Sequence, residues 1–140
     1  QALFDNTVSL LHSSWDHEVD AGDSLKLSIY WQAENQLESD WTAFVHLVSP
    51  DGTLMAGLDQ EPMGGYIPTT SWSPGQVVAY SVAIPVPRSA SAGDYHINIG
   101  WYKWPELHRL SAHSAFLPVA DQVVTLGTTF VRHTEALDTP

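Results

Sequence analysis

The chain has 140 residues, of which 44% are hydrophobic and 11% aromatic, so it is long and apolar enough to fold as one domain around its own core. Sixteen acidic and five basic residues leave a formal charge of -11, which repels phosphate backbones and anionic lipid and argues against a nucleic-acid partner or direct membrane insertion. The sequence has no cysteine and no apolar run near the roughly 20 residues of a membrane-spanning helix, which excludes disulfides, thiolate metal sites, a cysteine nucleophile and such a helix.

Alternating apolar and polar residues predict β-strands along most of the chain. Leu25, Leu27, Ile29 and Trp31, for example, alternate with polar residues, which is the two-residue period of a strand with one buried face. In chain order, strands are predicted over residues 8–11, 25–31, 42–48, 53–56, 78–84, 95–101, 107–110 and 123–131. No stretch carries the apolar spacing of an amphipathic helix, so helices longer than a single turn are not expected.

Turn residues separate the predicted strands in the way that antiparallel pairing requires. The Asp51-Gly52 pair predicts a hairpin turn, and Pro85 ends a strand because proline has no backbone N–H. Short strands with regular turns indicate an all-β, antiparallel β-sandwich of about eight strands, immunoglobulin- or fibronectin III-like or jelly-roll-like, with a closed barrel as the alternative. We expect one domain over residues 1–133 and a flexible C-terminal tail over residues 134–140.

One local motif sharpens the prediction of a sandwich. Gly93, Asp94 and Tyr95 follow a turn and open an alternating strand. This arrangement resembles the tyrosine corner of immunoglobulin-like and fibronectin type III domains, in which the phenol hydroxyl bonds to a nearby backbone group. An ordinary core tyrosine at the start of a strand is the alternative that the sequence leaves open.

An ordered series of residues spans nearly the whole chain, from Phe4 to Val131. Its members are Gly22, Asp23, Ser24, Leu25, Tyr30, Trp31, Gln32, Phe44, Val45, His46, Leu47, Asp51, Gly52, Asp59, Pro62, Gly64, Gly65, Pro68, Thr69, Trp72, Pro74, Gly75, Pro85, Gly93, Asp94, Tyr95, Gly100, Trp101, Tyr102, Arg109 and Leu110. The series resembles an uncharacterised immunoglobulin-like β-sandwich domain of bacterial cell-envelope proteins. That domain is often appended to membrane glycosyltransferases of the protein-mannosyltransferase type.

The resemblance implies an extracytoplasmic accessory module of the cell envelope, without catalytic activity, and the lack of a membrane-spanning apolar run predicts that the chain is soluble. The partners that it implies are glycans or the membrane glycosyltransferase region of the same protein, and it carries no established active site or cofactor. The segment from Trp101 to Pro105 departs from the family pattern, which more often has a single aromatic residue and a polar turn there. A second exposed tryptophan, Trp104, would therefore be particular to this chain.

Six tryptophans are more than a chain of this length ordinarily contains, and they suggest a sugar-binding platform, because aromatic rings stack on the apolar face of a pyranose. Trp31 and Trp101 fall on the predicted core faces of their strands, where packing explains them, and Trp41 could serve either purpose. The candidate binding residues in loops or on outward strand faces are Tyr66, Trp72, Trp104, Tyr102, Tyr30 and His96. The competing interpretation is that loop tryptophans cap an end of the sandwich.

Four carboxylates cluster around one predicted turn: Asp16, Glu18, Asp20 and Asp23. Oxygen-rich turns can hold calcium, which takes about six to eight oxygen ligands. The spacing lacks the central glycine and the closing glutamate of an EF-hand loop. We therefore favour a solvated acidic turn over a metal site.

No motif predicts catalysis, and we expect a protein that is not an enzyme. Asp59 and Glu61 would lie on one side of an extended segment, as a glycosidase carboxylate pair could, but nothing else in the sequence supports hydrolysis. The seven histidines show no zinc-binding spacing. His46 lies within an apolar strand and is predicted to be a structural histidine bonded to the Asp59 segment or to backbone.

Two functions therefore remain. The first is a carbohydrate-binding accessory module, which requires exposed aromatic residues with polar neighbours. The second is a structural or protein-interaction sandwich without a small ligand, which requires the loop aromatics to be buried against the domain itself. The exposure of Tyr66, Trp72 and Trp104 distinguishes the two.

Overall fold

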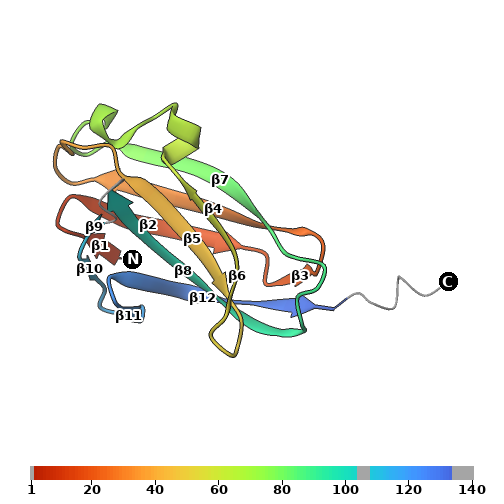
Figure 1. The fold of residues 1–140 in the computed structure, drawn as a ribbon. Helices are drawn as coiled ribbons and strands as arrows, with labels where there is room; N and C mark the ends of the chain where they lie inside the picture. Colours follow the sequence, from red (N-terminus) through yellow and green to blue (C-terminus); the bar gives the residue numbers. More distant parts are fainter. Residues whose placement is uncertain (1, 104–107, 134–140) are drawn as a thin grey trace.

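The computed structural model describes residues 2–103 and 108–133, which form a sandwich of two β-sheets (Figure 1). Sheet A has the spatial order β10 (Ala112–His113), β1 (Ala2–Phe4), β2 (Val8–Trp15), β4 (Ser24–Ala33) and β7 (Val77–Pro85). Sheet B has the order β11 (Val119–Ala120), β12 (Val123–Arg132), β8 (Gly93–Lys103), β5 (Thr42–Val48) and β6 (Leu54–Gln60), with β3 (Glu18–Asp20) beside β12 and β9 (His108–Arg109) beside β8. The predicted all-β sandwich is confirmed.

Most strand pairs are antiparallel, as predicted, whereas β3 and β12 pair in parallel. The predicted tail over residues 134–140 lies outside the described residues. Within the part of the chain that the structure describes, no helix is long and apolar enough to cross a membrane.

All eight predicted strands overlap strands of the structure. The bounds of β5 are those predicted, whereas β2 and β6 run further than their patterns indicate. The strand predicted over residues 107–110 corresponds to β9, with residue 107 outside the described residues. The sequence does not predict β1, β3, β10 and β11, because strands of two or three residues are too short to show an alternating pattern.

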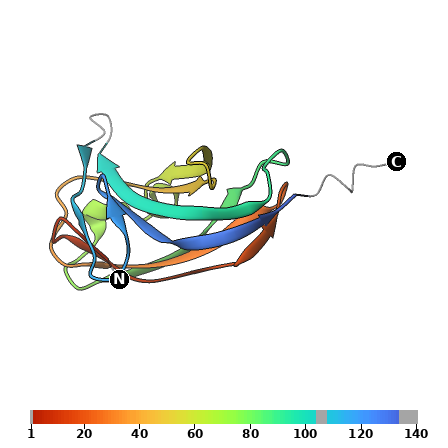
Figure 2. The ribbon, with the colours of Figure 1, turned by 90° about the horizontal axis from the view of Figure 1, so that it is seen from below.

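Both sheets curve in the same sense, as Figure 2 shows. In that view β8 and β12 bend so that their ends rise away from sheet A. The outer face of sheet B is therefore concave, and the outer face of sheet A is convex. A concave sheet face brings the outward-pointing side chains of neighbouring strands together, as a binding site requires.

Three tryptophans fill the space between the sheets. Trp31 of sheet A and Trp101 of sheet B lie with their ring centroids 4.7 Å apart, and Trp72 meets Trp101 edge-on at 6.0 Å. All three side chains are fully buried, so the predicted core positions of Trp31 and Trp101 are confirmed. Each such aromatic contact contributes roughly 0.5–1.5 kcal/mol beyond the burial of its area.

The connection between β6 and β7 folds across one end of the sandwich (Figure 1). It contains two short 3-10 turns, η1 (Pro62–Gly65) and η2 (Thr69–Ser71). The buried Thr69 hydroxyl donates a hydrogen bond to the Ser39 carbonyl at 2.7 Å and accepts one from the backbone N–H of Trp41 at 2.9 Å. These two bonds fix the connection to a distant loop, and Trp41 is half-buried beside it.

The predicted exposure of Trp72 is wrong. Trp72 directly follows η2, and the path that Thr69 fixes turns its indole into the core, where it is 0% exposed. The indole N–H donates a hydrogen bond to the Ile67 carbonyl at 2.9 Å, which satisfies its polar group inside the protein. The competing interpretation, a tryptophan that caps the end of the sandwich, is confirmed for this residue.

The predicted tyrosine corner is present. Tyr95 is fully buried at the start of β8, and its hydroxyl donates a hydrogen bond to the Ser91 carbonyl at 2.8 Å. The bond ties the turn before β8 to the strand that carries Trp101. It therefore helps to set where β8 begins.

We expect Tyr95→Phe to lower the free energy of unfolding by about 1–3 kcal/mol, because the Ser91 carbonyl loses its donor in a partly buried position. Tyr66→Phe removes the same hydroxyl from a side chain that is 90% exposed, and this control should change stability by less than about 0.5 kcal/mol. Urea unfolding followed by tryptophan fluorescence measures both. Equal losses in the two variants would contradict a role for the corner.

Candidate functional site

The concave face of sheet B brings together three polar side chains from adjacent strands, which we call the Asp59 cluster: His46 of β5, Asp59 of β6 and Tyr102 of β8. His46 Nε2 lies 3.4 Å from Asp59 Oδ1, so the predicted pairing of His46 with this segment is present. The Tyr102 hydroxyl donates a hydrogen bond to Asp59 Oδ2 at 3.2 Å. The Asp59 side chain is still 43% exposed, so the carboxylate is both oriented and accessible.

Two glycines allow aromatic rings to lie flat against this face. Phe44 lies over Gly100 of β8, where an added Cβ would come 2.4 Å from the ring, and His46 lies over Gly57 of β6, where the distance would be 3.0 Å. The rings of Phe44 and Tyr102 are stacked at 6.1 Å with an interplanar angle of 17°. Phe44 is only 2% exposed, so its ring supports the site from beneath rather than forming a platform.

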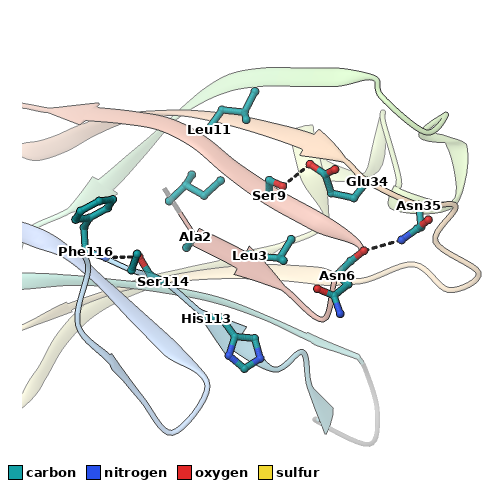
Figure 3. Close-up of a pocket in the computed structure, with 12 residues that line it drawn as sticks. Ala2, Leu3, Asn6, Ser9, Leu11, Glu34, Asn35, His113, Ser114 and Phe116 are labelled. Carbon is teal, nitrogen blue, oxygen red and sulfur yellow. Dashed lines mark hydrogen bonds between the residues drawn. The ribbon is translucent and has the colours of Figure 1, made fainter.

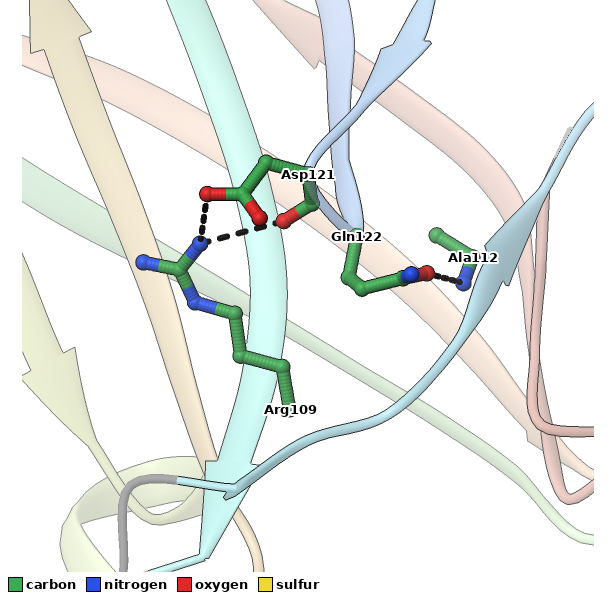
Figure 4. A network of polar contacts seen from close by, with 4 residues as sticks. All are labelled: Arg109, Ala112, Asp121 and Gln122. Atoms are coloured by element: carbon green, nitrogen blue, oxygen red, sulfur yellow. Dashed lines mark hydrogen bonds and ion pairs between the residues drawn. The ribbon is translucent and has the colours of Figure 1, made fainter.

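Arg109 of β9 covers the Phe44 ring. Its guanidinium carbon lies 5.3 Å from the ring centroid, a cation–π distance. Nη1 donates to both the carboxylate and the backbone carbonyl of Asp121, each at 3.1 Å (Figure 4). Asp121 and Gln122 join β11 to β12 with positive φ angles, as a two-residue type I′ turn requires, and the Gln122 side chain accepts the Ala112 N–H at 2.9 Å. This network holds Arg109 along one side of the face.

The surroundings of Tyr102 favour its protonated form. Partial burial raises the pKa of Tyr102 above its usual value of 10, and the negative charge of Asp59 and the hydrogen bond to that carboxylate raise it further. The phenol is therefore a hydrogen-bond donor at neutral pH. It holds one oxygen of Asp59 while the carboxylate keeps lone pairs for a ligand.

The predicted binding residues do not form one site. Tyr102 belongs to the Asp59 cluster, whereas the exposed His96 stands on the same face of β8 but six residues earlier, about 20 Å along the strand. Tyr30 is 43% exposed on the convex face of sheet A, and Tyr66 is 90% exposed in the β6–β7 connection. Trp104 lies outside the described residues. The described candidates therefore stand at separate places, and none of them combine into an aromatic platform.

Arg132 pairs with two of the four carboxylates of the acidic turn. Arg132 Nε lies 2.6 Å from Asp20 Oδ1, and its Nη1 lies 3.6 Å from Glu18 Oε2. Asp16 and Asp23 line the same open hollow as this arginine. Among the residues that the structure describes, no three His, Cys, Asp or Glu side chains gather in a way that could hold a metal ion. Arg132 therefore supplies one positive charge next to Glu18 and Asp20.

A separate open groove of about 680 Å³ lies on the outer face of sheet A, beside β1, β2 and β10 (Figure 3). Its lining includes the apolar Leu3, Leu11 and Phe116 and the polar Ser9, Glu34 and Asn35. Phe116 is 90% exposed, and the Ser9 hydroxyl donates to Glu34 Oε2 at 2.5 Å. Phe116 and Glu34 stand in connections rather than strands, so this groove is less firmly built than the Asp59 cluster.

Sequence reasoning missed Phe44, Arg109 and Phe116. Phe44 follows inward-facing Ala43 and precedes inward-facing Val45, so the alternation could have marked it as an outward aromatic residue. No local signal marks Arg109, because its contact with Phe44 depends on how β9 and β5 both pair with β8. Phe116 lies in a short segment of small residues, where an aromatic side chain has little to cover it.

Comparisons with known proteins define the fold and no more. No protein-family model and no curated protein matches the chain. Among solved structures, the C-terminal domain of wzt is similar with a TM-score of 0.60 and 12% identity, covering 96% of this chain and 78% of that one. A Niemann-Pick type C2 protein from the Japanese carpenter ant is similar with a TM-score of 0.55 and 8% identity, covering 91% of this chain and 95% of that one. Both likenesses support the β-sandwich.

We expect Asp59→Asn to lower the pKa of Tyr102, because the substitution removes the negative charge beside the phenol while its burial remains. An NMR titration of the assigned tyrosine ring carbons measures this pKa. Asp121→Asn is the matched control, since that carboxylate contacts Arg109 instead. A Tyr102 titration that Asp59→Asn leaves unchanged would show that the two side chains do not interact in solution.

Proposed function

We propose that the chain is a non-catalytic accessory module that binds a neutral, hydroxyl-rich glycan on the concave face of sheet B. The observation that carries the proposal is the Asp59 carboxylate, which two partners from neighbouring strands hold in place and which remains 43% exposed. A carboxylate only accepts hydrogen bonds, and sugar hydroxyls are its natural donors. Because strands β5, β6 and β8 fix its position, little order has to be gained on binding.

The other groups on this face suit the same ligand. His46 and Tyr102 contribute polar side chains next to Asp59. The half-buried Asn98 lies further along β8. The Asn98 side-chain oxygen accepts the Thr125 hydroxyl at 2.8 Å, which leaves its amide N–H groups as donors. The concave face therefore carries both an acceptor, Asp59, and donors, the Asn98 amide N–H groups, for the hydroxyl groups of a glycan.

The net charge of the chain and the partners of Asp59 indicate the class of glycan and favour binding over cleavage. The formal charge of -11 disfavours a polyanionic glycan, so a neutral one is proposed. The usual hydrolysis of a glycosidic bond needs two carboxylates on either side of that bond. Asp59 is instead held by an imidazole and a phenol, which supports retention of a glycan rather than its cleavage.

The cellular location that we propose rests on the resemblance of the sequence to a cell-envelope domain that is appended to membrane glycosyltransferases. A cell-envelope β-sandwich next to a membrane glycosyltransferase region would lie outside the cytoplasm, where it could hold an acceptor or product glycan close to that region. The similar solved structures support the sandwich itself. The glycosyltransferase region of the same protein is thus the proposed partner.

A glycan array of neutral and acidic glycans, followed by calorimetric titration of the tightest one, tests the proposal. We expect wild-type protein to retain neutral glycans, and Asp59→Asn to weaken binding by about ten-fold or more, since a charged acceptor is lost. Asp23→Asn alters an exposed carboxylate of the acidic turn and should bind as wild type does. Urea unfolding of each variant shows that the fold is intact.

Failure would take one of two forms. If the wild-type chain retains no glycan at millimolar concentration, the module has no such site, and the structural or protein-interaction sandwich is favoured. If glycans bind but Asp59→Asn and Asp23→Asn bind equally well, the concave face is not the site.

A further inference from the structure

Strand β7 (Val77–Pro85) is a long, regular strand at the edge of sheet A (Figure 1). It pairs with β4 through nine consecutive residue pairs and without a bulge. Residues 77–84 contain no charged residue, glycine or proline. Protected edges normally carry a lysine, a proline, a bulge or an inward-pointing charge, and β7 has none of these before Pro85.

The main-chain groups of alternate β7 residues point away from β4. Just outside the strand, the Gln76 carbonyl accepts the Ala33 N–H at 3.0 Å, and the Val86 N–H donates to the Asp23 carbonyl at 2.8 Å. Both even-numbered residues thus face the β4 side. In an antiparallel pair the direction alternates, so the N–H and C=O groups of Ala79, Ser81 and the other odd-numbered residues face the open edge.

Most of the outward side chains next to this edge are uncharged, and several of them are small. The odd-numbered side chains of β7 are exposed, and Ser81 lies in a row with Ser28 of β4 and Ser14 of β2. The Ser28 and Ser81 hydroxyls are 2.9 Å apart. Strands β2, β4 and β7 contain no aspartate or glutamate, although the chain has sixteen acidic residues. Lys26 is their one charged residue.

The other sheet edges are built differently. In the described part of the chain, β10 and β11 are two residues long, and β6 carries Asp59 and Gly57 and has an irregular register with β5. An exposed run of high β-propensity without charges is an aggregation hazard unless something covers it. Strand β7 is therefore the edge that most needs a partner.

We propose that β7 pairs antiparallel with β7 of a second copy, about a two-fold axis at Ser81, to form a continuous ten-stranded sheet from two five-stranded ones. A second copy satisfies both open edges in one contact, because the same surface is used on each side. With the axis at Ser81, Ala79 lies opposite Ala83 of the other copy on the outer face, Tyr80 lies opposite Val82 on the inner face, and no charged side chains of β7 meet. The absence of acidic residues lets two chains of charge -11 approach here.

Cysteine crosslinking of the 140-residue chain tests this contact, because the protein has no cysteine of its own. Paired strands would place the two Ser81 Cα atoms about 5.5 Å apart, within the roughly 4.4–6.8 Å range of disulfides. Under mild oxidation we expect Ser81→Cys to form linked dimers at least about ten-fold faster than Ser14→Cys. Ser14 is exposed in the same row but on β2, which β4 separates from the β7 edge, so it is a matched control. Equal rates overturn the proposal.

Sedimentation equilibrium provides a second, independent measurement. We expect a concentration-dependent dimer of the wild-type chain, and Ser81→Lys should raise its dissociation constant at least about ten-fold, since two lysines would face each other at the axis. Ser14→Lys adds the same charge to the same face and should dimerise as wild type does. A chain that stays monomeric up to its solubility limit, or a dimer that Ser81→Lys does not weaken, overturns the proposal. Neither result tests whether a single concave face binds a glycan, because that face lies on the other sheet.

Discussion

The contact between Trp31 and Trp101 in the core is the constraint on which the functional face depends. Trp101 points inward from β8, so the alternation of side chains turns Gly100 and Tyr102 outward onto the concave face. A slip of one residue would carry Trp101 to the surface and Tyr102 into the core. Losing a buried tryptophan from such a core costs about 3–5 kcal/mol, so the register of β8 is firmly set. The geometry of the Asp59 cluster is thus fixed from the opposite face of its own strand.

The long strands and the tyrosine corner could be predicted because their signals are local. An alternating run locates β4, and Gly93, Asp94 and Tyr95 mark the corner within three residues. Trp72 could not be placed in the same way. Its burial depends on the bonds of Thr69 to a loop about thirty residues earlier, and nothing near Trp72 in the sequence records those bonds.

The Asp59 cluster, too, could be predicted only in part from the sequence. The pairing of His46 with Asp59 could be anticipated, because Asp59 closely follows the predicted hairpin that contains His46. Tyr102 joins them only through the spatial order β6–β5–β8, which periodicity does not reveal. An aromatic platform was the natural expectation from six tryptophans. The structure uses at least three of them to fill its core, so the abundance reflects packing more than recognition.

The two-fold symmetry of the proposed dimer relates it to the proposed glycan-binding site. When two antiparallel edge strands pair, the two-fold axis runs perpendicular to the joint sheet. Equivalent faces of the two copies therefore lie on the same side of that sheet. The two concave faces of a β7-paired dimer would then open in the same direction. A glycan of repeating units that spans both would bind the second face intramolecularly, which raises the overall affinity without any new contact. That gain matters for a site of this kind, because hydrogen bonds to hydroxyl groups replace hydrogen bonds to water and contribute little net free energy at a single exposed face.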